Sequence, residues 1–381
     1  AADSIAKPEI SSEAGILYDV TNGRVLFEKN ADEKLAPAST TKLMTALLVL
    51  EKSKLDDKVT FSKTAVTNLE SGAVKIGLVE GDQVSVKDCL YGLLLKSANE
   101  VANGLAEHVS GSISAFADLM NARAKELGCT NTHFVNPNGL NSDQQYTTCR
   151  DMAKIAAAAF ANQTLCQIDS TLSYKFPATK AAAARTITPG HKMLYPNDSR
   201  YYAGIVGGKT GYTSKAGNTL VTCVEKDGVR MVAVILKSKS THYADTKKML
   251  DYGYQYVNTE KGNTTGNSTT TTTTAKQETA GKWVQDNGSW RYEFADGTKA
   301  VGTIYTIDAA DFGFDPDGKM VTGWKMFGTD WYYFESNGTM AKNAWRQDSG
   351  KWFYLGADGK IVRNTTIDNK YKVGADGAWV Q

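Results

Sequence analysis

The sequence predicts an α/β (α+β) body, with an antiparallel sheet and a helical block, followed by a solenoid of β-hairpins. Strand patterns at both ends of the first 257 residues enclose a run of helical patterns, and the last 100 or so residues repeat with a period of 20 to 21. A sheet assembled from both chain ends around helices is typical of such a body. We expect a body at 1–257, a linker at 258–280 and repeats at 281–381.

The body is expected to open with a hairpin. Strand patterns at 16–20 and 25–27 flank Asn22-Gly23, a pair that suits a type I′ turn. Pro37 then precedes an expected helix at 39–52, whose apolar residues lie on most faces and indicate burial. The remaining patterns predict helices at 87–95, 99–109, 114–127, 148–161 and 242–256, and strands within 203–236.

The end of the chain changes composition twice. Six consecutive threonines at 269–274 cannot bury enough apolar surface to offset their ordering entropy, which predicts a flexible linker. Beyond it, aromatic triplets recur, each seven residues before the glycine of an Asp-Gly or Asn-Gly pair, where we expect the hairpin turns. One hairpin is unstable alone, so the units must stack. Complete blocks begin at Trp283, Trp324 and Trp345, and degenerate blocks begin at Thr303 and Thr366.

Composition and charge exclude several classes. The 43 basic and 41 acidic residues nearly balance, which gives no reason to expect nucleic acid as a partner. The sequence has no run of 18 apolar residues, so no transmembrane helix is expected. The start at Ala1 without an initiator Met suits either signal-peptide removal or an engineered start.

The five cysteines form no C-x-x-C pair, so neither a zinc site nor a thioredoxin-like site is expected, and no cofactor is implied. Buried free thiols are the favoured interpretation. A Cys129–Cys149 or Cys149–Cys166 bridge stays open.

Ser39-Thr40-Thr41-Lys42 supplies a candidate nucleophile and base. Residues i and i+3 share a helix face, so Ser39 and Lys42 are expected to touch. Lysine can take the serine proton if burial and a nearby cation, for which Lys209 is the candidate, lower its pKa. Ser4-Ile5-Ala6-Lys7 matches the same pattern, but Pro8 follows and no helix is expected there.

Two further motifs complete an acyl-transfer site that needs no histidine. In Ser97-Ala98-Asn99, one side chain could simply cap the next helix. Alternatively, Ser97 would carry a proton to the leaving nitrogen and Asn99 would hold Lys42. Lys209-Thr210-Gly211 precedes a strand edge suited to an extended peptide, where Lys209 and Thr210 would bind a carboxylate.

Two other kinds of site, a phosphate-binding P-loop and a Ser-His-Asp triad, are not favoured by the sequence. Residues 203–210 fit a relaxed P-loop pattern, but a strand follows where a phosphate-binding helix is required. A Ser-His-Asp triad lacks a G-x-S-x-G elbow, so core or surface positions are expected for His108, His133, His191 and His242.

The motif set resembles the penicillin-recognising serine acyltransferases, and more closely the D-alanyl-D-alanine carboxypeptidases among low-molecular-weight penicillin-binding proteins. Over about 10–257, the resemblance rests on APASTTKLMT at 36–45, LLKSANE at 94–100, FVNPNGL at 134–140 and GKTGYT at 208–213. It implies a penicillin-binding/β-lactamase-like transpeptidase fold. It also implies removal of the terminal D-Ala from peptidoglycan stem peptides through an acyl-enzyme on Ser39, and acylation by β-lactams.

By the same resemblance, Lys42 is the base and the backbone N–H groups of Ser39 and Tyr212 form the oxyanion hole. The implied catalytic residues are Ser39, Lys42, Ser97, Asn99 and Lys209, and the implied substrate-binding residues are Thr210, Gly211 and Tyr212.

The sequence departs from the family at two positions. Asn138 stands where many relatives carry His, and His242 stands near the position of a frequent Arg, which leaves the carboxylate partner open. A class A β-lactamase is the enzymatic alternative, but 131–149 contains no Glu and Ser97-Ala98-Asn99 lacks the middle Asp of that class. A catalytically inactive wall-binding protein is the alternative outside enzymes.

The tail resembles the repeats of choline-binding and glucan-binding proteins. Adjacent aromatic blocks can pack on each other, or can face a quaternary ammonium or a sugar ring. The expected ligand contacts are Trp324, Trp331, Trp345 and Tyr354. These features imply a secreted, cell-wall-associated protein of a Gram-positive organism that binds wall choline or polysaccharide.

Overall fold

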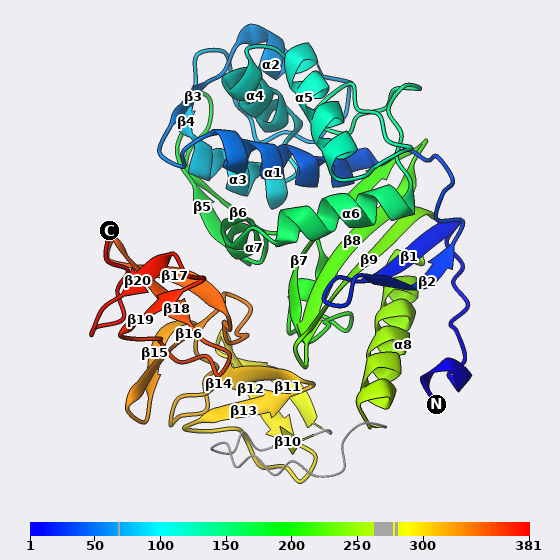
Figure 1. Ribbon diagram of the computed structural model, residues 1–381. Helices are drawn as coiled ribbons and strands as arrows, with labels where there is room; N and C mark the ends of the chain where they lie inside the picture. The colour runs from blue at the N-terminus through cyan, green and yellow to red at the C-terminus, as the bar shows by residue number, and fades with distance from the viewer. Residues whose placement is uncertain (68, 263–276, 279–280) are drawn as a thin grey trace. The chain divides into compact units, whose positions relative to one another are not determined.

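The computed structural model describes residues 1–67, 69–262, 277–278 and 281–381 (Figure 1). The chain forms two compact units: one comprises Ala1–Leu194 and Ile205–Ser268, the other Tyr195–Gly204 and Thr269–Gln381. Most of the linker predicted at 258–280 lies outside the described residues. Its first five residues belong instead to the last helix of the first unit, which ends at Gly262.

A five-stranded antiparallel sheet forms the centre of the first unit, in the order β2-β1-β9-β8-β7. As predicted, strands from both chain ends build it: β1 (Ala14–Asp19) and β2 (Arg24–Lys29) from the start, and β7 (Ile205–Thr213), β8 (Gly217–Lys226) and β9 (Val229–Ser238) from the end. Strand β1 pairs directly with β9, with Leu17 opposite Ala233. Because β8 and β9 are buried along most of their length, both faces of the sheet must be covered.

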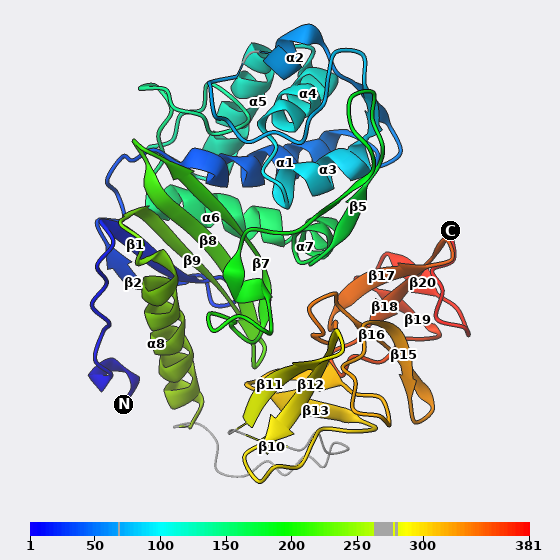
Figure 2. The same ribbon diagram turned by 180° about the vertical axis from the view of Figure 1, so that it is seen from behind.

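Helices supply that cover (Figures 1 and 2). Helix α6 (Cys149–Phe160) and helix α8 (His242–Gly262) pack on opposite faces of the sheet. The remaining helices form a block beyond α6: α1 (Thr41–Lys52), α2 (Lys63–Thr67), α3 (Val86–Leu94), α4 (Asn99–Ser110), α5 (Ile113–Glu126) and α7 (Gln163–Asp169). The predicted fold class is confirmed, and the short helices α2 and α7 are additions to the predicted set.

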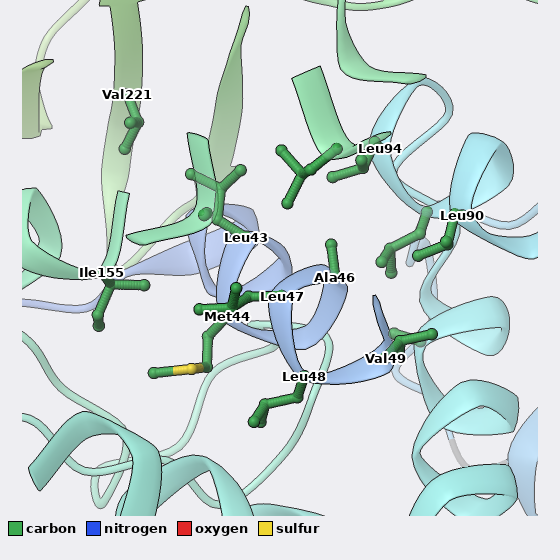
Figure 3. Packing of buried hydrophobic residues seen from close by; sticks show 14 of the residues in the cluster. Leu43, Met44, Ala46, Leu47, Leu48, Val49, Leu90, Leu94, Ile155 and Val221 are labelled. Carbon is green, nitrogen blue, oxygen red and sulfur yellow. The ribbon is translucent and has the colours of Figure 1, made fainter. Parts of the chain in front are cut away.

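Helix α1 is the centre of the block (Figure 3). Leu43, Met44, Leu47 and Leu48 are buried on different sides of it, and α1 contacts helices α3, α4 and α6. Burial of large apolar side chains contributes about 1.5–3 kcal/mol each. This packing fixes α1, and therefore the turn that precedes it, against the sheet.

Smaller hairpins border the block. They are β3 (Lys58–Thr60) with β4 (Gln83–Ser85), and β5 (Tyr174–Phe176) with β6 (Arg185–Ile187). Short 3₁₀ turns lie at Ala2–Ser4, Ala38–Thr40 and Lys192–Leu194.

The first hairpin does not use the predicted type I′ turn. Gly23 has a φ of 67°, but Asn22 is not among the residues with positive φ, and type I′ requires both. The Asp19 carboxylate instead accepts hydrogen bonds from the Asn22 backbone and side chain, at 3.0 and 2.8 Å. A side-chain bond therefore replaces the expected backbone geometry.

The described residues of the second unit form five consecutive hairpins. They are β11–β12 (Gly281–Asp286, Ser289–Phe294), β13–β14 (Ile304–Ile307, Ala310–Gly313), β15–β16 (Gly323–Phe327, Asp330–Phe334), β17–β18 (Ala344–Asp348, Lys351–Leu355) and β19–β20 (Thr365–Ile367, Tyr371–Val373). The two degenerate blocks therefore also form hairpins. A short strand, β10 (Gln277–Glu278), pairs with β13.

The hairpins stack through backbone hydrogen bonds between neighbouring blocks. The N–H of Ile361, which follows the fourth hairpin, donates to Trp331 O of the third at 3.2 Å. Trp379 N, after the fifth hairpin, donates to Trp352 O of the fourth at 2.8 Å. The predicted solenoid is therefore confirmed, because each block depends on its neighbour for part of its pairing.

The turn positions within the repeats differ from the prediction. The strands of the first hairpin are joined at Asn287-Gly288, with φ of 49° and 79°, whereas the predicted Asp296-Gly297 pair lies after its second strand. There the Asp296 carboxylate accepts the Thr298 N–H at 2.9 Å and turns the chain toward the next hairpin. The three predicted turn pairs, Asp296-Gly297, Asn337-Gly338 and Asp358-Gly359, thus follow the second strand of a hairpin and separate the blocks.

All five cysteines are free thiols, and only Cys129 is partly accessible. Burial raises the pKa of the Cys89 and Cys149 thiols, so they are packing residues. Neither bridge left open by the sequence is formed. Across the described ranges, no helix is both long and apolar enough to cross a membrane.

Candidate active site

Ser39 lies in the 3₁₀ turn Ala38–Thr40, and α1 begins two residues later at Thr41. The prediction had started the α-helix at Ser39 itself. The turn begins at Ala38, whose φ of 49° is uncommon for a residue with a side chain. It presents Ser39 at the start of the buried helix, with Lys42 in the first turn of α1.

Lys42 makes three hydrogen bonds and is fully buried. Its Nζ lies 2.9 Å from Ser39 Oγ, 2.8 Å from Asn99 Oδ1 and 2.7 Å from Asn138 O. The last two partners are carbonyl oxygens, which only accept hydrogen bonds. In the neutral amine they therefore engage both N–H bonds, and the remaining lone pair faces the Ser39 hydroxyl.

The surroundings of Lys42 favour this neutral amine. Burial places its pKa well below the usual value, the Lys209 cation lowers the pKa further, and the Glu100 carboxylate opposes both effects. Glu100 is itself buried and accepts backbone N–H bonds from Ile76 and Gly77. These surroundings therefore favour the form of Lys42 that has a lone pair available to the Ser39 hydroxyl.

The segment Ser97-Ala98-Asn99 does not cap α4 through a side chain. Ala98 occupies the cap position, and Asn99 is the first helical residue, so the capping interpretation is wrong. Ser97 has a φ of 60°, a strained backbone that persists only where surrounding contacts impose it. Asn99 Nδ2 donates to Val74 O at 3.1 Å, which turns its Oδ1 toward Lys42.

Lys209, Thr210 and Gly211 lie in β7, the edge strand of the sheet. Lys209 Nζ donates to Ser97 Oγ at 3.1 Å and to Thr210 O at 2.8 Å. Burial lowers the Lys209 pKa to about 8, and the Asp169 carboxylate raises it against that effect. Because 205–213 forms a strand, the P-loop interpretation is excluded.

Gly211 lies where the sheet approaches Ser39. A Cβ at this position would lie 2.3 Å from Thr219 Oγ1 and 2.8 Å from Ser39 N. Glycine therefore lets the β7 backbone approach the amide of Ser39. The adjacent Tyr212 side chain is 67% exposed, so it is available to a ligand at this edge.

Sequence reasoning missed the contribution of Asn138. Its backbone carbonyl accepts from Lys42, and its Nδ2 donates to Asn103 Oδ1 at 2.9 Å. The following Gly139 has a φ of 92°, and a Cβ there would lie 1.9 Å from Ala38 O. The only sequence signal was the Asn136-Pro137-Asn138-Gly139 turn, because a backbone carbonyl has no residue-type signature.

The histidines do not form a triad with Ser39. His191 is buried and its Nε2 lies 2.8 Å from Thr222 Oγ1. Burial, with His242 and Lys209, lowers its pKa to about 3 and keeps it neutral. Among the residues that the structure describes, no group of three or more His, Cys, Asp or Glu is placed to hold a metal ion.

A second candidate site lies in the repeats. A pocket of about 380 Å³ is lined by Trp324, Trp331, Asp348, Phe353, Ile361, Arg363 and Asp376. Trp324 and Phe353 meet edge to face, with ring centroids 5.6 Å apart. Two of the predicted ligand contacts, Trp324 and Trp331, thus line the pocket. The other two, Trp345 and Tyr354, pack against each other in the next hairpin at 5.2 Å.

Replacing Gly211 with alanine tests the close approach of β7 to the nucleophile. We expect acylation of Gly211→Ala by a labelled penicillin to slow at least about tenfold, because a small displacement of reacting groups has a large effect on rate. Gly262→Ala, where a Cβ meets nothing within 4 Å, is the matched control. An unchanged acylation rate in Gly211→Ala would show that β7 is free to move away.

The fold is the sheet-and-helix architecture of DD-peptidases, and its site places a serine hydroxyl beside a buried lysine amine. The D-alanyl-D-alanine carboxypeptidase (peptidase S11) profile matches residues 1–240, and the chain belongs to this family. Profiles of choline-binding repeats match 300–345 and 340–379, which indicates a cell-surface protein.

Curated relatives and solved structures agree with this family. The chain is 34% identical over 273 residues to the D-alanyl-D-alanine carboxypeptidase DacC of Escherichia coli, covering 68% of this chain and 65% of that protein. It is 34% identical over 268 residues to the enzyme of that name from Streptomyces sp. K15, covering 66% of this chain and 90% of the relative. It therefore spans about two thirds of the length of DacC.

The crystal structure of the Streptomyces K15 DD-transpeptidase is similar with a TM-score of 0.60 and 32% identity. The match covers 66% of this chain and all of that structure. The D-alanyl-D-alanine carboxypeptidase from Mycobacterium tuberculosis H37Rv gives a TM-score of 0.60 and 31% identity, covering 66% of this chain and 94% of the other.

Proposed function

We propose that this protein is a secreted serine carboxypeptidase that removes the terminal D-Ala from peptidoglycan stem peptides. The proposed catalytic residues are Ser39, Lys42, Ser97, Asn99 and Lys209, and the proposed substrate contacts are Thr210, Gly211 and Tyr212. The observation that carries the proposal is the buried Lys42 amine, held by two carbonyl oxygens so that its lone pair faces Ser39 Oγ. β-Lactams, which present a strained amide beside a carboxylate, would acylate the same serine.

In the acylation step, Lys42 takes the proton of Ser39 as Oγ attacks the carbonyl carbon of the penultimate D-Ala. The negative charge that develops on the carbonyl oxygen would be stabilised by the backbone N–H groups of Ser39 and Tyr212. Lys209 and Thr210 would hold the terminal carboxylate, whose charge an ammonium complements.

Collapse of this intermediate breaks the peptide bond. The proton taken by Lys42 must reach the leaving nitrogen, and the hydroxyl of Ser97, which accepts a hydrogen bond from Lys209, is proposed to carry it. D-Alanine then leaves. Water attacks the ester on Ser39 with Lys42 again accepting a proton, which restores the free hydroxyl and releases the shortened peptide.

Mass spectrometry after incubation with a labelled penicillin, combined with D-Ala release from a stem pentapeptide, tests this function. We expect a covalent adduct on the tryptic peptide that contains Ser39 and release of one D-Ala per turnover. An adduct that hydrolyses within seconds, without D-Ala release, would identify a β-lactamase. Absence of both adduct and D-Ala release would identify an inactive wall-binding protein.

For the repeats, we propose that the pocket lined by Trp324, Trp331 and Phe353 binds the choline of cell-wall polymers. Aromatic faces attract a quaternary ammonium. The carboxylates of Asp348 and Asp376 add negative charge to the same lining, which favours a cation over a neutral sugar. This binding would hold the secreted enzyme at the wall of a Gram-positive cell.

Trp331→Ala is expected to weaken choline binding by about 2- to 30-fold, corresponding to about 0.5–2 kcal/mol for a cation–π contact. The measurement is retention of the full-length protein on a choline resin and its elution by free choline. Met326→Ala is the matched control, because Met326 pairs with Trp331 in the hairpin and is exposed but does not line the pocket. Elution by soluble glucan instead of choline would reassign the ligand.

A further inference from the structure

Asp169 is a buried acidic residue to which the reaction described above gives no role. It ends α7 and is 1% exposed. Its Oδ2 accepts the backbone N–H of Gly208 at 2.6 Å. Asp169 therefore contacts the main chain of β7 one residue before Lys209.

The backbone of β7 is shaped to receive this carboxylate. The pairing of β7 with β8 shifts register between Ile205 and Gly207, where the strand bulges. A Cβ at Gly207 would lie 2.6 Å from Asp169 Oδ2 and 2.7 Å from the Phe160 ring. Only glycine admits the carboxylate at this distance, so the bulge and Asp169 fit each other.

The buried charge also needs a partner. An isolated carboxylate in the interior is strongly unfavourable unless it is hydrogen-bonded and paired with an opposite charge. Burial raises the Asp169 pKa to about 7, while the Gly208 hydrogen bond and the Lys209 ammonium oppose that increase. Lys209 donates hydrogen bonds to the neutral oxygens of Ser97 and Thr210, so Asp169 supplies a negative charge that these bonds do not.

The other ionisable groups near this pair have their own partners or are neutral. Arg230 of β9 donates to Phe160 O and to the Glu225 carboxylate. His191, beside Lys209, is neutral, and burial raises the pKa of the Cys223 thiol of β8. The ionisable groups whose charges couple to this pair are Lys42 and His191, which interact with Lys209, and Cys223, which interacts with Asp169.

We propose that Asp169 is a positioning residue for Lys209: its carboxylate fixes the β7 bulge and keeps Lys209 protonated. This inference rests on the proposed function, in which the two buried lysines must hold different charges. Lys42 must be neutral to accept a proton, and Lys209 must be an ammonium to bind the substrate carboxylate. The Asp169 carboxylate raises the pKa of Lys209 and is not among the groups that act on Lys42. The two lysines can therefore hold different charges.

The test is the pH profile of kcat/KM for D-Ala release by Asp169→Asn. Asparagine keeps an acceptor for the Gly208 N–H and removes the charge. Because the pKa of Lys209 then falls, the basic limb of the profile should move to lower pH. We expect kcat/KM at pH 9, relative to pH 7, to fall up to about tenfold more than in the wild type, equivalent to about one pH unit.

Asp245→Asn is the matched control. Asp245 is also a buried carboxylate, bonded to Ser12 and Thr241 at 2.5 and 2.8 Å, so its loss should lower the melting temperature without moving either limb. If Asp169→Asn lowers kcat/KM by the same factor at every pH, the role of Asp169 is structural and the proposal is overturned. If the wild type releases no D-Ala, the proposed function fails instead.

A measurement on the wild type covers the case in which Asp169→Asn does not fold. Trace acetylation of Lys209, followed by mass spectrometry across pH 6–8, reports its neutral fraction. A lysine that titrates independently of other groups is acetylated about tenfold more slowly for each pH unit below its pKa. Coupling to a titrating Asp169 should make this decrease shallower, and a full tenfold slope would contradict the proposal.

Discussion

Ser39→Ala is expected to abolish both the penicillin adduct and D-Ala release. The proposed reaction passes through an ester on Ser39 Oγ, and alanine removes the only atom of that side chain able to form it. The Lys42 amine would keep its bonds to Asn99 and Asn138, so the fold should be preserved. Labelling with fluorescent penicillin, alongside circular dichroism, measures both properties.

The chain contains a matched control for this variant. Ser4 is also followed three residues later by a lysine, yet its Oγ donates to Ala1 O in the 3₁₀ turn Ala2–Ser4. Ser4→Ala should therefore label at the wild-type rate. Persistent labelling of Ser39→Ala, with the adduct on another residue, would remove Ser39 from the mechanism.

Lys42→Met is expected to slow penicillin acylation by about 10²–10⁴-fold, the usual contribution of a general base. Methionine approximates the volume of the lysine chain, so the packed interior of α1 should tolerate it. The loss reflects chemistry because the Ser39 hydroxyl would remain in place without an acceptor for its proton. Stopped-flow acylation of the purified variant gives the rate.

The pH dependence of acylation in the wild type tests the same assignment. Burial lowers the pKa of Lys42 well below its usual value, so the neutral amine persists to lower pH than in an exposed lysine. Acylation should therefore decrease toward acid pH in the wild type, and this limb should be absent in Lys42→Met. Lys7→Met, in the unrelated Ser4–Lys7 pattern, should retain both rate and profile. A wild-type rate in Lys42→Met would contradict the base assignment.

Much of the fold was predictable because its signals are local. The apolar faces of 39–52 and the strand patterns within 203–236 repeat at helix and strand periods, and both became elements at nearly those positions. The stack of hairpins followed from the repeat period. The turns were less predictable, since Asn22-Gly23 uses a side-chain bond from Asp19 in place of the expected geometry.

The site was only partly predictable. Contact between Ser39 and Lys42 follows from a spacing of three residues, but the capping role considered for Ser97 and Asn99 was wrong because Ala98 holds the cap. In the repeats, the sequence suggested Trp345 and Tyr354, whereas Phe353 of that block lines the pocket. Alternate residues of a strand face opposite ways, so the register decides which aromatic ring reaches it.

The sequence by itself determined the order of the three motifs, the α/β body and the repeat architecture, because residue type and short spacing are sufficient for each. Tertiary structure alone decided where the Lys42 lone pair points. That direction depends on Asn99 and on the Asn138 carbonyl, 57 and 96 positions away. It likewise placed Asp169 against the bulge of β7, 39 positions from Gly208. Such distances depend on how α1, α4, α7 and β7 pack, which no local pattern encodes.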